Sequence, residues 1–242
     1  MESQLYVHSI ESLGALDGPG LRTVIFLSGC PLKCQYCHNP DSWLMTSGKA
    51  MTKETLFKKL MRMSPYFKNK GGVTFSGGDP LLQASALIPL VRRLKQEGIH
   101  VALDTSGALW SSEVESLIEL VDLVLLDVKH TNDHAYRQLT SGNLQDTYFF
   151  LNSLIRLNKP YWIRQVVIPT INNTIEQLYI LEYETRSEYR QKIELLPYHK
   201  KALYKWLALG QICPLSHLPE ISREDIKLLI NKMTLPFSTF EF

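Results

Sequence analysis

Three cysteines lie close together in the sequence, at Cys30, Cys34 and Cys37. Thiolates are ligands of both zinc and iron–sulfur clusters, and the number of ligands helps to separate the two. A structural zinc ion takes four protein ligands, whereas a four-iron cluster held by three thiolates leaves one iron open to a ligand that is not protein. The Cys-x3-Cys-x2-Cys spacing therefore favours an iron–sulfur cluster with one open coordination position.

A zinc site completed by His38 or Cys213 is the alternative. His38 directly follows Cys37, which makes it awkward to place both side chains on one tetrahedral ion. Cys213 is distant in the sequence and is expected to be a free, packed thiol. Three thiolates alone would leave zinc an open, catalytic position. With zinc bound instead of iron, the protein would be a structural or interaction module.

Composition excludes several other classes. The chain has 242 residues, is 45% hydrophobic and has a net charge of +2, so it can bury a full core but has no basic excess for nucleic acid. No apolar run is long enough to span a membrane, and the N-terminus lacks the regions of a signal peptide. We therefore expect a monomeric cytoplasmic protein with one domain over residues 1–242, binding neither nucleic acid nor membrane. In that compartment, clustered cysteines indicate metal binding or catalysis rather than disulfides.

Short β-branched runs alternate with helical stretches along the chain. Six strands are predicted, over Thr23–Ser28, Val73–Ser76, His100–Asp104, Leu123–Val128, Tyr161–Ile168 and Ile193–Leu196. Helices are predicted after the N-cap residue Thr52 and over about Ala84–Glu97, Ser111–Leu120, Asp133–Gln138, Thr147–Leu157, Ile175–Tyr183 and Arg223–Met233. Because the strands are mostly apolar and helices separate them, we expect an α/β fold with a parallel sheet.

Six βα units are too few for an eight-stranded barrel, so the fold expected is a partial (β/α)6 TIM-like barrel. Its core would cover about residues 22–197, with a C-terminal segment over about 198–242. Polar or glycine-rich groups follow the strand ends, namely the cysteine loop, Gly77-Gly78-Asp79, Asp104, Asp127-Val128-Lys129 and Pro197-Tyr198-His199. In parallel barrels these ends converge on the face where active sites form.

Several of these groups also have a structural interpretation. Gly77-Gly78 could be an ordinary turn that uses positive φ, and either Asp104 or Asp127 could cap the following helix. Arg164 lies inside an apolar strand, where it must pair with a buried carboxylate or reach an anion. His199 could be a polar surface residue.

Several motifs together resemble a known family. The loop Gly29–His38, with Tyr36 between its last two cysteines, resembles the signature of the radical S-adenosylmethionine (SAM) superfamily. Gly77-Gly78-Asp79-Pro80 resembles the Gly-Gly-Glu-Pro motif of that superfamily, with Asp79 in place of Glu. Asp17-Gly-Pro-Gly20 and Leu195-Leu-Pro-Tyr-His199 resemble segments of the activating enzymes of glycyl-radical enzymes. The chain has no cysteines for an additional ferredoxin-like module, as in the compact pyruvate formate-lyase type.

The resemblance implies a set of site residues. Cys30, Cys34 and Cys37 would hold one 4Fe-4S cluster that carries the redox chemistry. The implied SAM-binding residues are Tyr36, Cys37, His38, Gly77, Gly78, Asp104, Asp127, Val128, Lys129, Arg164 and His199. Asp104 and Asp127 are also implied ligands of a monovalent cation, and Asp17 is an implied contact of the substrate peptide.

The resemblance also implies the reaction. Flavodoxin or ferredoxin would reduce the cluster, SAM would be cleaved reductively, and a hydrogen atom would be removed from a glycine of a pyruvate formate-lyase-like partner. Such a cluster is sensitive to oxygen, so function is expected under anaerobic conditions. The alternative within the superfamily is a radical SAM enzyme that acts on a different peptide, a small molecule or a nucleotide.

Overall fold

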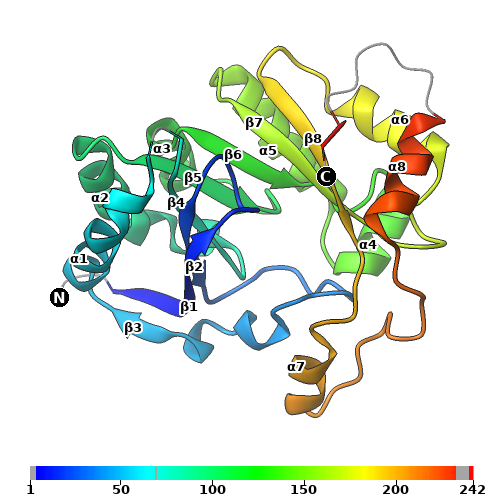
Figure 1. The fold of residues 1–242 in the computed structure, drawn as a ribbon, viewed down its shortest axis with the longest axis horizontal. Helices are drawn as coiled ribbons and strands as arrows, with labels where there is room; N and C mark the ends of the chain where they lie inside the picture. The colour runs from blue at the N-terminus through cyan, green and yellow to red at the C-terminus, as the bar shows by residue number, and fades with distance from the viewer. Residues whose placement is uncertain (1–3, 69, 233–239, 242) are drawn as a thin grey trace.

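The computed structural model describes residues 4–68, 70–232 and 240–241. In these residues one sheet of nine strands has the order β3-β1-β2-β4-β5-β6-β7-β8-β9 (Figure 1). Its strands are β1 (Leu5–Gly14), β2 (Arg22–Leu27), β3 (Lys49–Met51), β4 (Gly72–Gly77), β5 (His100–Thr105), β6 (Leu123–Asp127), β7 (Tyr161–Val167), β8 (Arg190–Pro197) and β9 (Phe240–Glu241). The sheet is curved but does not close, because β3 and β9 lie at opposite edges.

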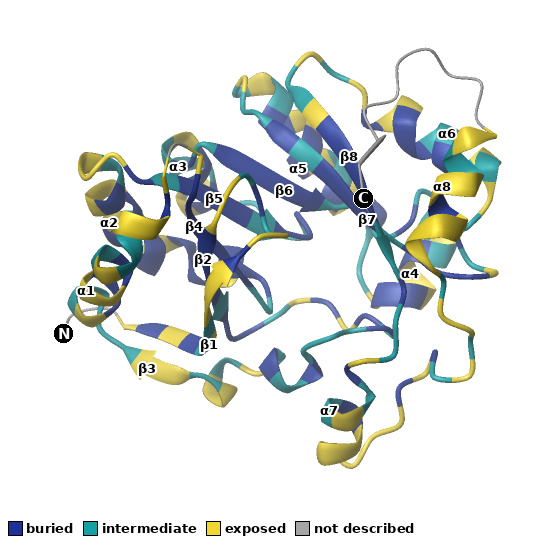
Figure 2. Cartoon of the chain, viewed as in Figure 1, coloured by how far each residue is buried: buried dark blue, intermediate teal, exposed yellow. Residues whose placement is uncertain are grey.

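The six predicted strands are confirmed as β2 and β4–β8, with boundaries shifted by three residues at most. They pair in parallel and in sequence order, which gives the predicted partial (β/α)6 barrel. Their residues are mainly buried (Figure 2). Since all six run in the same direction, their carboxyl ends lie along one rim of the sheet.

Three strands were not predicted. β1 pairs antiparallel with both β2 and β3, and β9 adds to the outer edge of β8. In β1, Leu5 and Val7 are buried, but the alternation then breaks down, so the apolar pattern is too short to identify the strand. β3 has three residues, none of them buried.

Eight α-helices are found in the described residues: α1 (Lys53–Met63), α2 (Ala84–Gln96), α3 (Ser112–Leu120), α4 (Asp133–Thr140), α5 (Leu144–Arg156), α6 (Ile175–Glu184), α7 (Leu203–Ala208) and α8 (Arg223–Asn231). Short 3-10 turns are η1 (Pro40–Ser42), η2 (Met45–Ser47), η3 (Ser64–Tyr66) and η4 (Pro80–Gln83). The side chain of Thr52 accepts a hydrogen bond from Thr55 N, which confirms the predicted N-cap. α7 was not predicted, and α5 begins three residues earlier than expected because Asn143 caps it.

The main hydrophobic core lies between the sheet and its helices. Strand residues such as Phe75, Leu103 and Leu126 pack with helix residues such as Leu90 and Leu117. A second cluster includes Leu32, Tyr36 and Tyr198 and supports the cysteine loop. None of the helices in the described part of the chain combines the length and apolar character that crossing a membrane requires.

Candidate functional site

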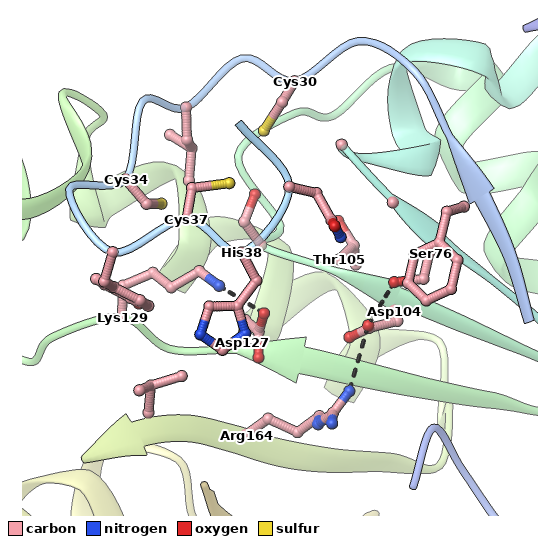
Figure 3. A pocket seen from close by; sticks show the side chains of 18 of the residues that line it. Cys30, Cys34, Cys37, His38, Ser76, Asp104, Thr105, Asp127, Lys129 and Arg164 are labelled. Atoms are coloured by element: carbon pink, nitrogen blue, oxygen red, sulfur yellow. Dashed lines mark hydrogen bonds and ion pairs between the residues drawn. The ribbon is translucent and has the colours of Figure 1, made fainter. Parts of the chain in front are cut away.

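A cavity of about 230 Å³ opens at the carboxyl ends of the parallel strands. It is lined by residues from segments far apart in the sequence (Figure 3). The predicted site residues on its walls are Asp17, Cys30, Cys34, Tyr36, Cys37, His38, Gly77, Gly78, Asp104, Asp127, Lys129 and Arg164. Two predicted residues, Val128 and His199, do not line this cavity.

The cysteine loop is fixed to the end of α4 by its backbone. Lys33 N donates to Thr140 O at 2.8 Å, and Gln35 N donates to Leu139 O at 2.9 Å. These bonds hold the loop at both sides of Cys34, and all three thiols are free. Burial raises the pKa of Cys34 to about 12, so without a metal this thiol keeps its proton. A bound metal would favour the thiolate form, because thiolates are the form that ligates.

Gly77, the last residue of β4, and Gly78, which follows it, pack against the end of β2 and the first residue of the cysteine loop. Gly77 has a φ of +119°, and a Cβ there would lie 2.2 Å from Leu27 N. A Cβ on Gly78 would lie 2.2 Å from Gly29 O. Gly78 N donates to Leu27 O at 2.7 Å, which joins the end of β4 to the end of β2. Glycine is therefore required here by the close approach of two backbones, whatever else binds nearby.

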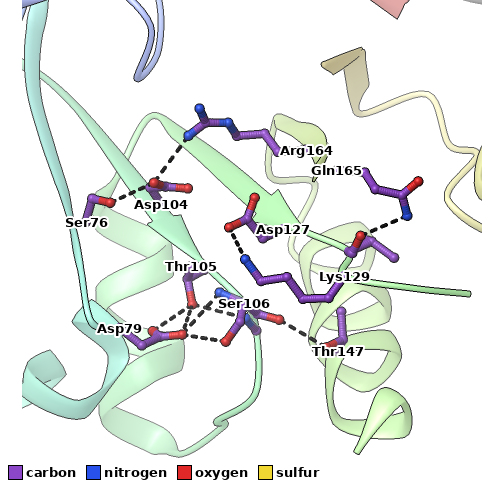
Figure 4. Close-up of polar contacts among 12 residues, drawn as sticks. Ser76, Asp79, Asp104, Thr105, Ser106, Asp127, Lys129, Thr147, Arg164 and Gln165 are labelled. Carbon is purple, nitrogen blue, oxygen red and sulfur yellow. Dashed lines mark hydrogen bonds and ion pairs between the residues drawn. The ribbon is translucent and has the colours of Figure 1, made fainter. Parts of the chain in front are cut away.

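Asp79 connects the loops that follow β4 and β5 (Figure 4). Its buried carboxylate accepts hydrogen bonds from Thr105 Oγ1 at 2.8 Å, Ser106 Oγ at 2.6 Å, Ser106 N at 3.1 Å and Leu81 N at 3.1 Å. Burial raises the pKa of Asp79, and the hydrogen bonds oppose that shift. Asp79 does not line the cavity, and it supports the site by joining the two loops that do.

Asp127 and Lys129 form a charged pair on the cavity wall. The Lys129 ammonium lies 2.5 Å from Asp127 Oδ2 and 6.0 Å from the centre of the Tyr36 ring. Burial lowers the pKa of Lys129, but Asp127 and its other neighbours raise it well above its ordinary value. The residue between them, Val128, packs its side chain in the core. Its N–H and C=O are both hydrogen-bonded within the protein.

Arg164 is surrounded by three carboxylates. It lies 2.9 Å from Glu194, 3.2 Å from Asp104 and 3.5 Å from Asp17. The structure thus shows the buried ion pairing that was one interpretation of this arginine. Asp104 also accepts a hydrogen bond from Ser76 Oγ at 2.7 Å. Burial raises the pKa of Asp104 to about 6 even though Arg164 lowers it.

His38 and His199 form a stacked pair next to the cavity. Their ring centres are 4.2 Å apart and their planes are inclined by 26°. Burial, together with the nearby His199, lowers the pKa of His38 to about 4. His199 lies in a smaller adjoining hollow with Tyr36, Cys37 and Trp206.

Three residues near the site had no assigned role in the sequence analysis. Trp206 Nε1 donates to Cys37 O at 2.9 Å, and Trp43 lines the cavity. Glu194 is the nearest carboxylate to Arg164. An acidic residue inside an apolar strand was a possible signal for Glu194, because a buried charge requires a partner. The contact between Trp206 and Cys37 joins segments 169 residues apart in the sequence, so the sequence pattern does not reveal it.

Comparisons with known proteins agree with this site. A family described as a 4Fe-4S single cluster domain matches residues 16–146. The pyruvate formate-lyase-activating enzyme of Clostridium pasteurianum is 42% identical over 225 residues, which cover 92% of this chain and 94% of that protein. The enzyme of the same name from Listeria monocytogenes is 35% identical over 94% of each chain.

Solved structures show the same fold. A domain of a pyruvate-formate lyase-activating enzyme from Bacteroides vulgatus has a TM-score of 0.53 and 25% identity, covering 66% of this chain and 91% of that one. A radical SAM methyltransferase from Sphaerobacter thermophilus has a TM-score of 0.63 and 16% identity, covering 91% of this chain and 66% of that one. At 16% identity the latter supports only the fold. Because the relatives from Clostridium pasteurianum and Listeria monocytogenes are 42% and 35% identical to it over more than 90% of both chains, the chain belongs to the pyruvate formate-lyase-activating enzymes, a family of radical SAM oxidoreductases.

Proposed function

We propose that this chain generates the glycyl radical of a pyruvate formate-lyase-like enzyme by reductive cleavage of SAM and removal of a hydrogen atom from a partner glycine. The observation that carries the proposal is the convergence of Cys30, Cys34 and Cys37 with two charged clusters in one cavity. This arrangement occurs in a chain 42% identical to an activating enzyme over nearly its full length.

The cavity fits an iron–sulfur cluster and a charged cofactor. Three free thiols reach it from one loop, and no disulfide competes for them. Buried polar atoms on its walls that have no hydrogen-bond partner among the described residues include Tyr36 Oη, His38 Nε2 and Asp104 Oδ1. Buried polar atoms of this kind are costly unless a ligand or water satisfies them. They are therefore available to a bound molecule.

The roles of the chain's residues follow from their chemistry. Cys30, Cys34 and Cys37 would hold the cluster, which together with SAM supplies the one-electron chemistry. Lys129 and Arg164 offer cations to the SAM carboxylate, and Asp104 and Asp127 offer carboxylates to its amino group. Asp104 and Asp127 would also hold a monovalent cation. Their carboxylates already pair with Arg164 and Lys129, respectively. Asp104 Oδ1, which has no hydrogen-bond partner among the described residues, would be the acceptor available to the cation.

Asp17 is proposed to contact the substrate peptide. It lines the cavity from the loop before β2, and Thr74 Oγ1 donates to its backbone carbonyl at 2.6 Å. This bond fixes the loop, while the carboxylate, 21% exposed, remains within reach of a segment that enters from outside. A backbone N–H of a glycine loop is a suitable donor to such a carboxylate.

The test combines the anaerobically reconstituted protein with SAM, a one-electron donor such as flavodoxin or ferredoxin, and inactive pyruvate formate-lyase. The expected result is a glycyl-radical EPR signal that grows with time. A Cys30→Ala variant is the control, in which the signal and the cleavage of SAM should both disappear. SAM cleavage without a glycyl signal would reject this partner and favour another substrate. A preparation that binds zinc and neither iron nor sulfide would reject the reaction altogether.

A further inference from the structure

Two indole rings lie beside Cys37. The Trp43 ring meets Trp206 edge to face, with ring centres 5.3 Å apart and an interplanar angle of 88°. Trp206 Nε1 donates to Cys37 O, so one indole holds the backbone of this cysteine. Cys30 N donates to Trp43 O at 3.2 Å, which fixes the backbone of Trp43 to the cysteine loop. Trp43 is thus tied to the loop at both its backbone and its ring.

The indole N–H of Trp43 is not satisfied in the described structure. Its Nε1 is buried and has no partner with regular hydrogen-bond geometry among the described residues. Trp43 and Cys37 line the same cavity. The Trp43 indole is close enough to the Cys37 thiol to lower its pKa, although burial raises that pKa by more and no regular hydrogen bond forms. A protonated thiol is a weak acceptor, so the N–H gains little from it.

A thiolate that ligates iron is a stronger acceptor than a thiol, because it carries negative charge. We propose that Trp43 is a positioning residue whose indole N–H donates to the Cys37 sulfur when the cluster is bound, and thereby favours the reduced cluster. The inference rests on the proposed function only in that Cys37 must ligate the cluster. Trp43 would thus set the reduction potential of the cluster, whereas the three cysteines hold its metal.

The negative charge on the thiolates explains why an indole N–H would favour the reduced cluster. Reduction adds one electron to the cluster and makes its thiolates more negative, so an N–H···S bond becomes stronger in the reduced state. Hydrogen bonds to the sulfurs are among the factors that set the potential of such clusters. Removing the N–H should therefore lower the midpoint potential. A shift of 59 mV corresponds to a tenfold change in the one-electron reduction equilibrium.

The test is the Trp43→Phe variant of the reconstituted protein, which removes the N–H and keeps an aromatic ring. The midpoint potential is measured by anaerobic redox titration without SAM, alongside the iron and sulfide content. We expect normal cluster content and a potential more negative by about one tenfold step in the equilibrium. A Trp110→Phe variant is the control, because Trp110 packs on Phe149 and Phe150 instead of on the cysteine loop.

A spectroscopic measurement on the unmutated protein covers the case in which Trp43→Phe fails to load iron. With tryptophan labelled by 15N in the indole, pulsed EPR of the reduced cluster should show a weak 15N coupling. The coupling should persist in Trp110→Phe and Trp206→Phe. An unchanged potential in a fully loaded Trp43→Phe protein, or no 15N coupling in the unmutated protein, would overturn the inference. If the unmutated chain binds no cluster at all, the proposed function fails instead.

Discussion

The hydroxyl of Ser106 donates a 2.6 Å hydrogen bond to the buried carboxylate of Asp79. The two residues come from loops that follow neighbouring strands, and both loops contribute to the cavity wall. The family motif has Glu at this position, and the Asp79 side chain is one methylene shorter. In the structure the short acid is matched by a small hydroxyl residue, and together they hold the loops in register.

A Glu at position 79 is therefore expected to disrupt this pairing. Asp79→Glu pushes the carboxylate one methylene further into Thr105 and Ser106 and should cost about 1–3 kcal/mol of unfolding free energy. Ser106→Gly in the same chain opens space and should recover part of that loss. Urea unfolding of the two single variants and the double variant gives the coupling energy. Strictly additive effects would show that the two residues do not act as a pair.

The order of the six parallel strands was predictable because each is an apolar run separated by a helix with clear end signals. β1 was not predictable, since only its first residues alternate and half of its residues are exposed. Its hydrogen bonds to β2 stabilise it instead. That support comes from tertiary structure and leaves little pattern in the sequence.

The cysteines and the strand-end carboxylates were predictable as candidates because their residue types and spacing are unusual. Their partners were not. An arginine in an apolar strand indicates that some carboxylate must be near, but only the fold shows that Asp17, Asp104 and Glu194 all lie within 3.5 Å of Arg164. The contact between Trp206 and Cys37 likewise joins the cysteine loop to a helix that the sequence did not predict.

Removal of Arg164 should be strongly destabilising. Arg164→Met removes the cation beside the largely buried Asp104 and leaves Glu194 paired with Lys192 alone. We therefore expect a loss of about 3–5 kcal/mol in the free energy of unfolding. Arg137→Met is the matched control, because Arg137 forms an exposed pair with Asp133 and should change stability by no more than about 0.5 kcal/mol. Chemical unfolding at pH 7 measures both. Similar small losses would mean that the carboxylate cluster tolerates an absent cation.

Asp17 should affect the partner reaction more than the cofactor reaction. Asp17→Asn keeps the size of the side chain and removes the charge that would accept from a peptide N–H. We expect a fall of about tenfold or more in the rate of glycyl-radical formation, since a hydrogen bond to a charged group contributes about 1.5–3 kcal/mol. SAM cleavage without partner should change much less. EPR and chromatography of the cleavage products measure the two rates, and equal losses would argue against a peptide contact.

His100 should make the folded protein sensitive to acid. Burial, and then the charge of Arg22, lower its pKa. Arg22 Nη2 lies 3.2 Å from His100 Nδ1, a geometry that suits a neutral imidazole. In the unfolded chain a histidine gains a proton below about pH 6.5. The stability linked to this group is therefore complete above that pH and is lost as the pH falls.

The His100→Gln variant tests this sign. Between pH 7.5 and 5.5 the unmutated protein should lose more unfolding free energy than the variant does. His134→Gln, at an exposed position on α4, controls for the loss of a histidine in general. Both are measured on the metal-free reduced chain, because acid also attacks iron–sulfur clusters. A steeper fall in His100→Gln than in the unmutated protein would contradict the assignment.

Cys213 should prove to be a structural thiol even though it lies near the cysteine loop. It is buried, and its Sγ donates to Gln35 O at 3.3 Å, a bond that a serine hydroxyl can also make. Cys213→Ser should therefore bind the same amounts of iron and sulfide as the unmutated protein, with a stability loss of no more than about 1–2 kcal/mol. Cys34→Ser should lose the cluster, because Cys34 is one of only three thiols on the cavity wall. Loss of iron in Cys213→Ser would instead identify a fourth protein ligand, and with it the closed thiolate site that the spacing of the first three cysteines argues against.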